Sequence, residues 1–157
     1  MGSPSCLTDP ASSVVIDTSA AINILGTGCA AQIVRALPNR LLAVDAVPGE
    51  LEEGRRRGRR EADLFDEIVA TGLIEIVALA NPANLIFGNL VKGNAADTLD
   101  DGEAATIAYA VEHRATAVID ERKAIRICRE RYPSLAIGST VDILAHPEIL
   151  RALGHAT

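Results

Sequence analysis

The chain has 157 residues, of which 48% are hydrophobic and 23% are charged, a composition typical of one globular domain and not of a disordered chain. The formal net charge of −6 excludes a general attraction to nucleic acids or acidic membranes, so any contact with a polyanion must come from a local patch or from bound cations. Aromatic residues make up only 3%, which argues against binding of single strands by base stacking.

The first residues, MGSPSCLTDPASS, contain neither the basic start nor the apolar stretch of a signal peptide. We expect residues 1–12 to be a flexible leader or a cloning remnant, and residues 13–157 to form a single domain. No apolar run approaches the roughly 18 residues of a membrane span. The sequence therefore predicts a soluble protein without a membrane partner.

Three cysteines, Cys6, Cys29 and Cys128, are widely spaced and form neither a CxxC pair nor a zinc pattern. Disulfides belong to oxidising compartments. We therefore expect three reduced thiols in a cytoplasmic protein.

The first half of the chain alternates between short apolar runs and helical segments. SVVID (13–17) predicts a strand that ends in an acid, and TSAAINIL then begins a helix that Thr18 or Ser19 can cap. CAAQIVRAL (29–37) predicts a second helix, stopped by a proline, and RLLAVDAV (40–47) predicts the next strand.

The middle of the chain continues this alternation. PGELEEGRRRGRREADLFDEIVATG (48–72) predicts two helices separated or kinked at a glycine, and LIEIVAL (73–79) predicts a strand with one wetter face. NPANLIFGNLVKGNAAD (81–97) is ambiguous, a short helix with a loop. DDGEAATIAYAVEHR (100–114) carries an apolar stripe at helical spacing and predicts a helix.

The last part begins with a buried strand, ATAVID (115–120), and an amphipathic helix in which Ile125 and Cys128 face inward. SLAIGS (134–139) predicts the final strand, and a helical tail follows it. Strands that alternate with helices favour parallel pairing. The sequence therefore predicts an α/β fold, a three-layer α/β/α sandwich around a mainly parallel central sheet.

Four acids are expected at one edge of this sheet. Asp17 and Asp120 end strands, Glu50 lies in the first turn of the helix after a strand, and Glu103 lies in the first turn of its own helix. In open parallel sheets, ligands bind beyond the carboxyl ends of the strands. Each acid also has an ordinary structural explanation, because Asp17 and Asp120 could cap helices, Glu50 suits a first turn, and Asp100 with Glu103 has the D-x-x-E spacing of a capping box.

Taken together, the four acids favour a cation site. Carboxylates a few ångströms apart repel one another strongly in partly buried surroundings, and VVIDTSAAINIL contains no basic residue that could neutralise Asp17. Mg²⁺ and Mn²⁺ prefer oxygen ligands. Either ion would relieve the repulsion.

The order of these segments resembles the PIN-domain nucleases, a family that includes many toxins of prokaryotic toxin–antitoxin pairs. The resemblance rests on VVIDTSAAINIL, DAVPGELEEG, LDDGEAATIAYA, AVIDERKAIRICRE and LAIGSTVDIL, and covers about residues 13 to 150. Carried over by position, it implies a metal site and supporting hydroxyls at these residues: Asp17, Glu50, Glu103 and Asp120 as ligands, Glu121 and Asp101 as additional candidates, Thr18 and Ser19 as hydroxyls.

The same resemblance implies a metal-dependent endoribonuclease that cleaves single-stranded RNA by two-metal hydrolysis with Mg²⁺ or Mn²⁺. It also implies an antitoxin protein as partner and a homodimer. Two alternatives stay open at this point. One is a catalytically silent PIN-like module for protein interaction, and the other is a phosphatase fold, which would want D-x-D where the chain has DTS.

A run of arginines, GRRRGRR (54–60), follows Glu50 in an otherwise acidic protein. Its cations could bind the backbone of an RNA strand; they could also form a solvated helix face or contact an acidic partner. The arginines concerned are Arg55, Arg56, Arg57, Arg59 and Arg60. Histidine-based cleavage is disfavoured because none of the three histidines, His113, His146 and His155, lies at an acid-bearing strand end.

Overall fold

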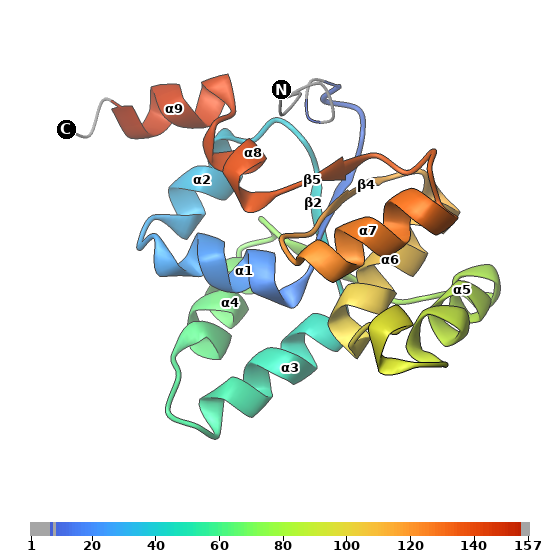
Figure 1. The fold of residues 1–157 in the computed structure, drawn as a ribbon. Helices are drawn as coiled ribbons and strands as arrows, with labels where there is room; N and C mark the ends of the chain where they lie inside the picture. Colours follow the sequence, from blue (N-terminus) through green and yellow to red (C-terminus); the bar gives the residue numbers. More distant parts are fainter. Residues whose placement is uncertain (1–6, 8, 155–157) are drawn as a thin grey trace.

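The computed structural model describes residues 7 and 9–154. Its strands form one five-stranded sheet in the order β3-β2-β1-β4-β5, and every pair of neighbours is parallel (Figure 1). The strands are β1 (Val14–Ile16), β2 (Leu41–Val44), β3 (Glu75–Val77), β4 (Thr116–Val118) and β5 (Ile137–Gly138). Helices cover both faces, so the predicted three-layer sandwich with a parallel sheet is confirmed.

Two groups of helices cover the two faces of the sheet. Helices α1, α2, α3, α4, α8 and α9 contribute to one buried cluster, and α5, α6 and α7 to the other. Their bounds are α1 (Thr18–Gly26), α2 (Ala30–Ala36), α3 (Ala46–Arg55), α4 (Glu61–Ala70), α5 (Asn81–Val91), α6 (Asp101–His113), α7 (Arg122–Arg131), α8 (Thr140–Leu144) and α9 (Pro147–Gly154), with a short 3₁₀ turn, η2 (Ala95–Asp97), before α6. Within the described part of the chain, no helix has the length and apolar character that a membrane crossing requires.

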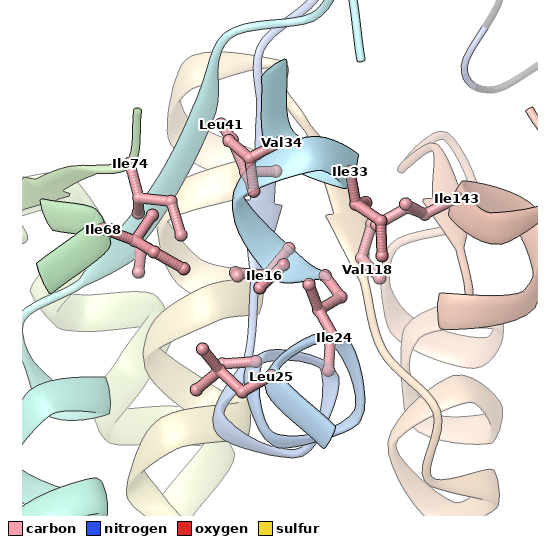
Figure 2. Close-up of a cluster of buried hydrophobic side chains, with 14 of the residues drawn as sticks. Ile16, Ile24, Leu25, Ile33, Val34, Leu41, Ile68, Ile74, Val118 and Ile143 are labelled. Atoms are coloured by element: carbon pink, nitrogen blue, oxygen red, sulfur yellow. The ribbon is translucent and has the colours of Figure 1, made fainter. Parts of the chain in front are cut away.

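The strands supply both cores because their side chains alternate between faces. Val14 and Ile16 enter the first cluster, which Figure 2 shows, whereas Val15 between them enters the second. All three are at most 1% exposed, and burying such a side chain stabilises the fold by roughly 1.5–3 kcal/mol. Strand β1 is therefore held from both faces as well as by β2 and β4, and the acid that follows it has a fixed position.

The structure corrects the boundary after the second strand. The strand expected over 40–47 ends at Val44, and α3 begins at Ala46. Pro48 falls within the first turn of α3, where its missing N–H would have no helical partner in any case. Glu50 therefore lies in the second turn and not, as expected, in the first.

Two other segments differ in detail from their predictions. In α7 the fully buried positions are Ala124, Ile127 and Cys128, while Ile125, expected to face inward, is only half-buried. The ambiguous segment 81–97 forms an eleven-residue helix, α5, followed by the turn η2.

Part of the expected leader packs against the domain. Leu7 is 1% exposed and belongs to the first core cluster. The side-chain amide of Asn39 donates hydrogen bonds to the backbone carbonyls of Asp9 and Ser12, at 2.8 and 2.9 Å. Residues 1–6 and 8, with Cys6, and residues 155–157, with His155, lie outside the described residues, so the expected leader and domain boundary stay predictions.

Candidate active site

The sheet order creates a switch point between β1 and β4. The chain runs outward from β1 to β2 and β3, then returns to place β4 on the other side of β1. The helices that follow these two strands leave in opposite directions at their carboxyl ends, where open α/β sheets bind ligands. Asp17 follows β1 directly, Asp120 lies just beyond β4, and the Asp17 N–H donates to the carbonyl of Val118 at 3.3 Å.

Asp17 is a fully buried acid with half of its carboxylate unsatisfied. Its Oδ1 accepts a hydrogen bond from the Ala20 N–H at 2.8 Å, so Asp17 caps α1, which is one of its expected roles. Thr18 and Ser19, which were also candidates for this cap, do not form it. Its Oδ2 is buried without a hydrogen-bond partner among the described residues. A buried polar atom without a partner costs free energy, so this oxygen marks a place where a ligand would be favoured.

The pKa of Asp17 is raised from an ordinary 3.8 to about 7. Burial is the main cause, because the charged form loses hydration, and the negative charges of Asp120, Asp100 and Glu50 raise it further. The capping N–H of Ala20 acts in the opposite direction but is outweighed.

Glu50 reaches the same edge from α3 and lies against the start of α6. Its Oε1 accepts a hydrogen bond from the Thr18 hydroxyl at 2.7 Å. A Cβ at Gly102 would lie 1.9 Å from that oxygen and 2.9 Å from the Thr18 hydroxyl. Only glycine therefore allows α6 to approach the Thr18–Glu50 pair this closely. Ser19, the other expected hydroxyl, is exposed and makes no side-chain hydrogen bond to these acids within the described residues.

Glu103 enters the site from the first turn of α6. The Asp100 carboxylate caps this helix by accepting from the Glu103 N–H at 3.0 Å. The reciprocal bond of the expected capping box, from the Asp100 N–H to the Glu103 carboxylate, is not formed in the described structure. The side chain of Glu103 is itself buried, with 8% exposure. Burial raises its pKa to about 7, and the charges of Asp100, Glu121 and Asp17 add to the effect.

Asp120 is held by three donors and does not cap the following helix, contrary to one of its expected roles. Glu121 caps α7 by accepting from the Ala124 N–H at 3.0 Å. Asp120 accepts instead from the Asn23 amide at 2.9 Å, from the Thr140 N–H at 2.8 Å and from the Thr140 hydroxyl. Neither Asn23 nor Thr140 was expected at this site from the sequence. The only signal for Thr140 is the Ser-Thr pair that opens the helical tail directly after a strand.

Electrostatic interactions join these acids into one cluster. The pKa shifts of Asp17, Glu50 and Glu103 each include a repulsive contribution from other acids of the edge, and no lysine or arginine contributes to any of the three shifts. The acids that interact are Asp17, Glu50, Asp100, Asp101, Glu103, Asp120 and Glu121. The four acids expected as ligands and both additional candidates therefore lie at one edge of the sheet, near enough to interact by charge.

The donor chemistry of this cluster fits a hard divalent cation. As the side chains stand, no group of three or more Asp, Glu, His or Cys residues among those described is arranged to hold a metal ion. Carboxylates without a counter-ion are expected to stand apart, because they repel one another. The unpartnered, buried Oδ2 of Asp17 and the oxygen-only donor set nevertheless match the preference of Mg²⁺ and Mn²⁺.

Of the five arginines, Arg55 is committed to the fold. It forms ion pairs with Glu52 of its own helix and with Asp63 and Asp66 of α4, at 3.3, 2.7 and 3.2 Å. These contacts tie the two helices of the α3–α4 hairpin together. The positive charge of Arg55 is therefore largely neutralised by these acids and is not available to a polyanion.

The other four arginines lie at the exposed turn between α3 and α4, which projects from the body of the molecule (Figure 1). Arg56 pairs with Glu53 at 3.3 Å. Arg57, Arg59 and Arg60 form no ion pair within the described residues. The free positive charge of the run is thus concentrated on these three side chains.

Neither of the two described histidines forms a side-chain hydrogen bond or ion pair with the acids of the site. His113 stacks on Tyr109 in the last turns of α6, with ring centroids 4.1 Å apart. His146 accepts a hydrogen bond from the Glu148 N–H. Both have structural contacts of the kind expected for histidines at helix ends.

Comparison with known proteins gives two findings. A family model described as a PIN domain matches residues 13–146. Among solved structures, a chain in the crystal structure of VapBC2 from Rickettsia felis bound to a DNA fragment from their promoter superposes with a TM-score of 0.51 at 16% identity, covering 80% of this chain and 97% of that one. At this identity the likeness shows the fold alone. A search of curated proteins finds no match.

Replacing Gly102 by alanine should disturb the site more than the fold. The new Cβ displaces the Glu50 carboxylate, the mobile end of a side chain, and breaks its hydrogen bond with Thr18. We expect the free energy of unfolding to change by less than about 1 kcal/mol, because alanine favours the helix, while Mn²⁺ affinity falls roughly 10-fold. Calorimetry and urea denaturation measure the two effects. The control is Gly88→Ala in α5, where a Cβ meets nothing within 4 Å; equal Mn²⁺ affinity in both variants would contradict the close-packing argument.

The raised pKa of Asp17 predicts that the metal-free protein loses stability as the pH rises. The Asp17 carboxyl keeps its proton up to about pH 7 in the folded state and only to about pH 3.8 in the unfolded state. Its contribution to the free energy of unfolding is therefore complete below pH 3.8 and is lost as the pH rises from 3.8 to about 7. The loss is on the order of 2–4 kcal/mol. Asp17→Asn should abolish this loss of stability, because asparagine does not ionise. In EDTA, the free energy of unfolding of the variant should therefore exceed that of the wild type at pH 8 and approach it at pH 5.

Urea denaturation at several pH values tests this prediction. Glu67→Gln, which alters an exposed acid of α4, should keep the wild-type profile. Parallel pH profiles for the wild type and Asp17→Asn would show that the Asp17 carboxyl does not hold its proton in the folded state.

Proposed function

The chain belongs to the PIN-domain family, and from this premise we propose that it is a metal-dependent endoribonuclease that cleaves single-stranded RNA. PIN domains are generally nucleases that use divalent metals. The observation that carries the proposal is the buried, unpartnered carboxylate oxygen of Asp17 at the centre of a cluster of acids. A buried acid with no cation beside it lowers stability, and a nuclease metal site gives this arrangement a reason.

In the proposed site, Asp17, Glu50, Glu103 and Asp120 would hold Mg²⁺ or Mn²⁺. When bound in a two-metal site, the ions would supply the acidity that activates a water and the positive charge that neutralises the scissile phosphate. Phosphodiester hydrolysis of this kind leaves a 5′-phosphate and a 3′-hydroxyl.

The protein's own contribution to this chemistry is orientation. The Thr18 hydroxyl donates to Oε1 of Glu50, which leaves Oε2 of that carboxylate available to a ligand. The donors from Asn23 and Thr140 fix both oxygens of Asp120 in place. Partners of this kind hold metal-binding carboxylates in one orientation.

Substrate binding is assigned to the exposed turn between α3 and α4. We assign contacts with the RNA backbone to Arg57, Arg59 and Arg60, with Arg56 as a weaker contributor because Glu53 pairs with it. Arg55, expected from sequence to join them, is assigned a structural role. Phosphate contacts by these cations would attract single strands to a protein whose net charge is otherwise negative.

The likeness in fold to VapBC2 supports a further proposal, that the chain is the toxin of a toxin–antitoxin pair. An antitoxin protein would then be its partner, the active form would be a homodimer, and the protein would act in the cytoplasm. The alternative is a catalytically silent interaction module. The observation in favour of that alternative is that the acids, as they stand in the described residues, are not arranged to hold a metal ion.

Cleavage of a mixed-sequence single-stranded RNA tests the proposed reaction. The wild type should cut with Mg²⁺ or Mn²⁺ and stop with EDTA, and Asp17→Asn should reduce the rate to background while Glu67→Gln cuts normally. An inactive wild type that also binds no Mn²⁺ in calorimetry would favour the silent module. Mn²⁺ binding without cleavage would reject general single-stranded RNA as the substrate.

The salt dependence of RNA binding tests the arginine assignment, measured in the non-cleaving Asp17→Asn background. Replacing Arg57, Arg59 and Arg60 together by alanine should weaken binding and flatten the plot of log K against log[salt] by about 2, since each phosphate contact on a single strand contributes roughly 0.7 to the slope. Arg55→Ala should lower the Tm, because it leaves acids of α3 and α4 without their partner, but should keep the slope. Equal slopes in all three proteins would exclude the turn as the RNA-binding surface.

A further inference from the structure

The segment that leads into the acidic start of α6 has little structure of its own. Between the end of α5 and Asp100, residues 92–97 are exposed, and the only regular element is the three-residue turn η2. Leu99 is the one fully buried side chain of this connection. Asp100 follows it at once, so the placement of this segment adds to the packing of α6 on the sheet and on α5 in determining where the first acids of α6 lie.

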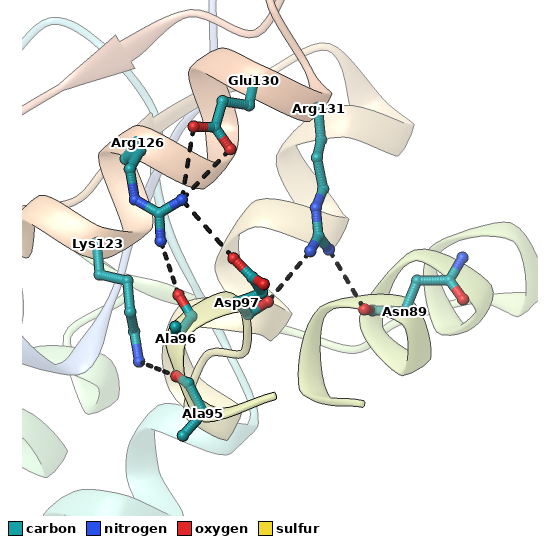
Figure 3. Close-up of polar contacts among 8 residues, drawn as sticks. All are labelled: Asn89, Ala95, Ala96, Asp97, Lys123, Arg126, Glu130 and Arg131. Carbon is teal, nitrogen blue, oxygen red and sulfur yellow. Dashed lines mark hydrogen bonds and ion pairs between the residues drawn. The ribbon is translucent and has the colours of Figure 1, made fainter. Parts of the chain in front are cut away.

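Three basic side chains from one helix, α7, hold this segment (Figure 3). They donate to three successive backbone carbonyls of η2: Lys123 Nζ to Ala95 at 3.1 Å, Arg126 Nη2 to Ala96 at 2.7 Å, and Arg131 Nη2 to Asp97 at 3.2 Å. We call these three side chains the α7 clamp. Carbonyls at the end of a helical turn lack helical partners, so the clamp satisfies groups that would otherwise face only water.

Arg126 is the centre of the α7 clamp. Its guanidinium is oriented by Glu130 one turn further along α7, at 3.3 Å, and also lies 3.8 Å from the Asp97 carboxylate. Arg131 extends the clamp to α5 by donating to the carbonyl of Asn89 at 3.4 Å. The clamp therefore joins α5, η2 and α7 across a stretch that contains no strand pairing.

The α7 clamp acts against a force that the site itself creates. The same helix that carries the clamp begins beside Asp120 and Glu121, and Glu121 repels Glu103 of α6. Asp100 in turn repels Asp17. This repulsion acts to separate the start of α6 from β1 and α7. Cationic contacts between α7 and the segment just before α6 oppose that movement.

These contacts are poor candidates for a role in overall stability. Arg126, Asp97 and Glu130 all have side chains more than 40% exposed, and exposed ion pairs contribute typically less than about 1 kcal/mol. Their contribution is therefore to the position of one segment and not to the stability of the whole domain.

We propose that Lys123, Arg126 and Arg131 are positioning residues that hold the start of α6, which Asp100 caps, so that Glu103 stays at the candidate metal site. The proposal rests on the proposed function, since it supposes a divalent cation at that site. None of the three side chains touches the cation or the substrate. They act through the backbone of η2.

Arg126→Ala tests the α7 clamp, with Arg129→Ala as the matched control. Arg129 is an exposed arginine of the same helix that makes no hydrogen bond or ion pair within the described residues. By charge alone, removing either arginine should slightly strengthen the binding of a cation nearby. If the α7 clamp positions α6, the affinity for the cation should instead fall when Arg126 is removed, and only then. We expect Mn²⁺ affinity in calorimetry to fall about 3-fold in Arg126→Ala, within the free energy that such exposed contacts contribute, to recover partly in Arg126→Lys, and not to fall in Arg129→Ala.

Amide hydrogen exchange provides a readout that needs no metal. Exchange over residues 93–103 should be faster in Arg126→Ala than in the wild type, with little change in Tm, and should be unchanged in Arg129→Ala. Lys123→Ala, which removes one carbonyl contact, should show a smaller effect in the same direction, and it replaces Arg126→Ala if that variant does not fold.

Two results would overturn the proposal: Mn²⁺ affinity in Arg126→Ala equal to or above that of the wild type, or an equal loss in Arg129→Ala. A wild type that binds no Mn²⁺ would overturn the proposed function, and with it this role. Hydrogen exchange over residues 93–103 distinguishes these two failures. If the α7 clamp does not hold the segment, exchange in Arg126→Ala equals that of the wild type. If the clamp holds the segment but the site binds no cation, exchange in Arg126→Ala is still faster.

Discussion

The mutual repulsion of acids at one edge of a parallel sheet is the constraint on which the rest of this structure depends. Asp17 is fully buried there, and its pKa is raised to about 7. Two of the neighbouring acids are held in place by donors from other elements: Glu50 by Thr18, and Asp120 by Asn23 and Thr140. A fold that brings these groups together accepts a local loss of stability, as binding sites commonly do.

Close packing is the second requirement, and α6 meets it with small residues. Gly102 lets the Glu50 carboxylate lie almost on the helix backbone. The alanines that follow, Ala104, Ala105 and Ala108, are at most 2% exposed, so the helix is enclosed between the sheet and α5. The alanine-rich stretch is thus not a sign of weak structure. Small side chains are what allow a helix carrying Glu103 to reach the centre of the molecule.

The sequence was sufficient for those features that repeat along the chain. Alternating apolar runs and helical stripes predicted the parallel sheet, and acids at strand ends predicted the cluster, because both follow from periodicity and chain direction. Prediction from the sequence was wrong or incomplete where a single contact determines an element boundary or a site residue. Helix α3 begins earlier than expected because Pro48 is tolerated inside a first turn. Thr140 was missed because its partner, Asp120, lies 20 positions earlier in the chain, just beyond β4. The α7 clamp left no pattern at all, since its acceptors are backbone carbonyls.

The order of the strands has a consequence for the making of the protein. The site is centred on β1, which is synthesised first, but Asn23 of α1 and its partner Asp120 are 97 positions apart in the chain, and Thr140 comes later still. A chain emerging from the ribosome therefore holds Asp17 for most of its synthesis without the acids and donors that complete the cluster. Domains fold as units when their chain is available. This order delays the completion of the acid cluster until the segment that carries Thr140 has been made.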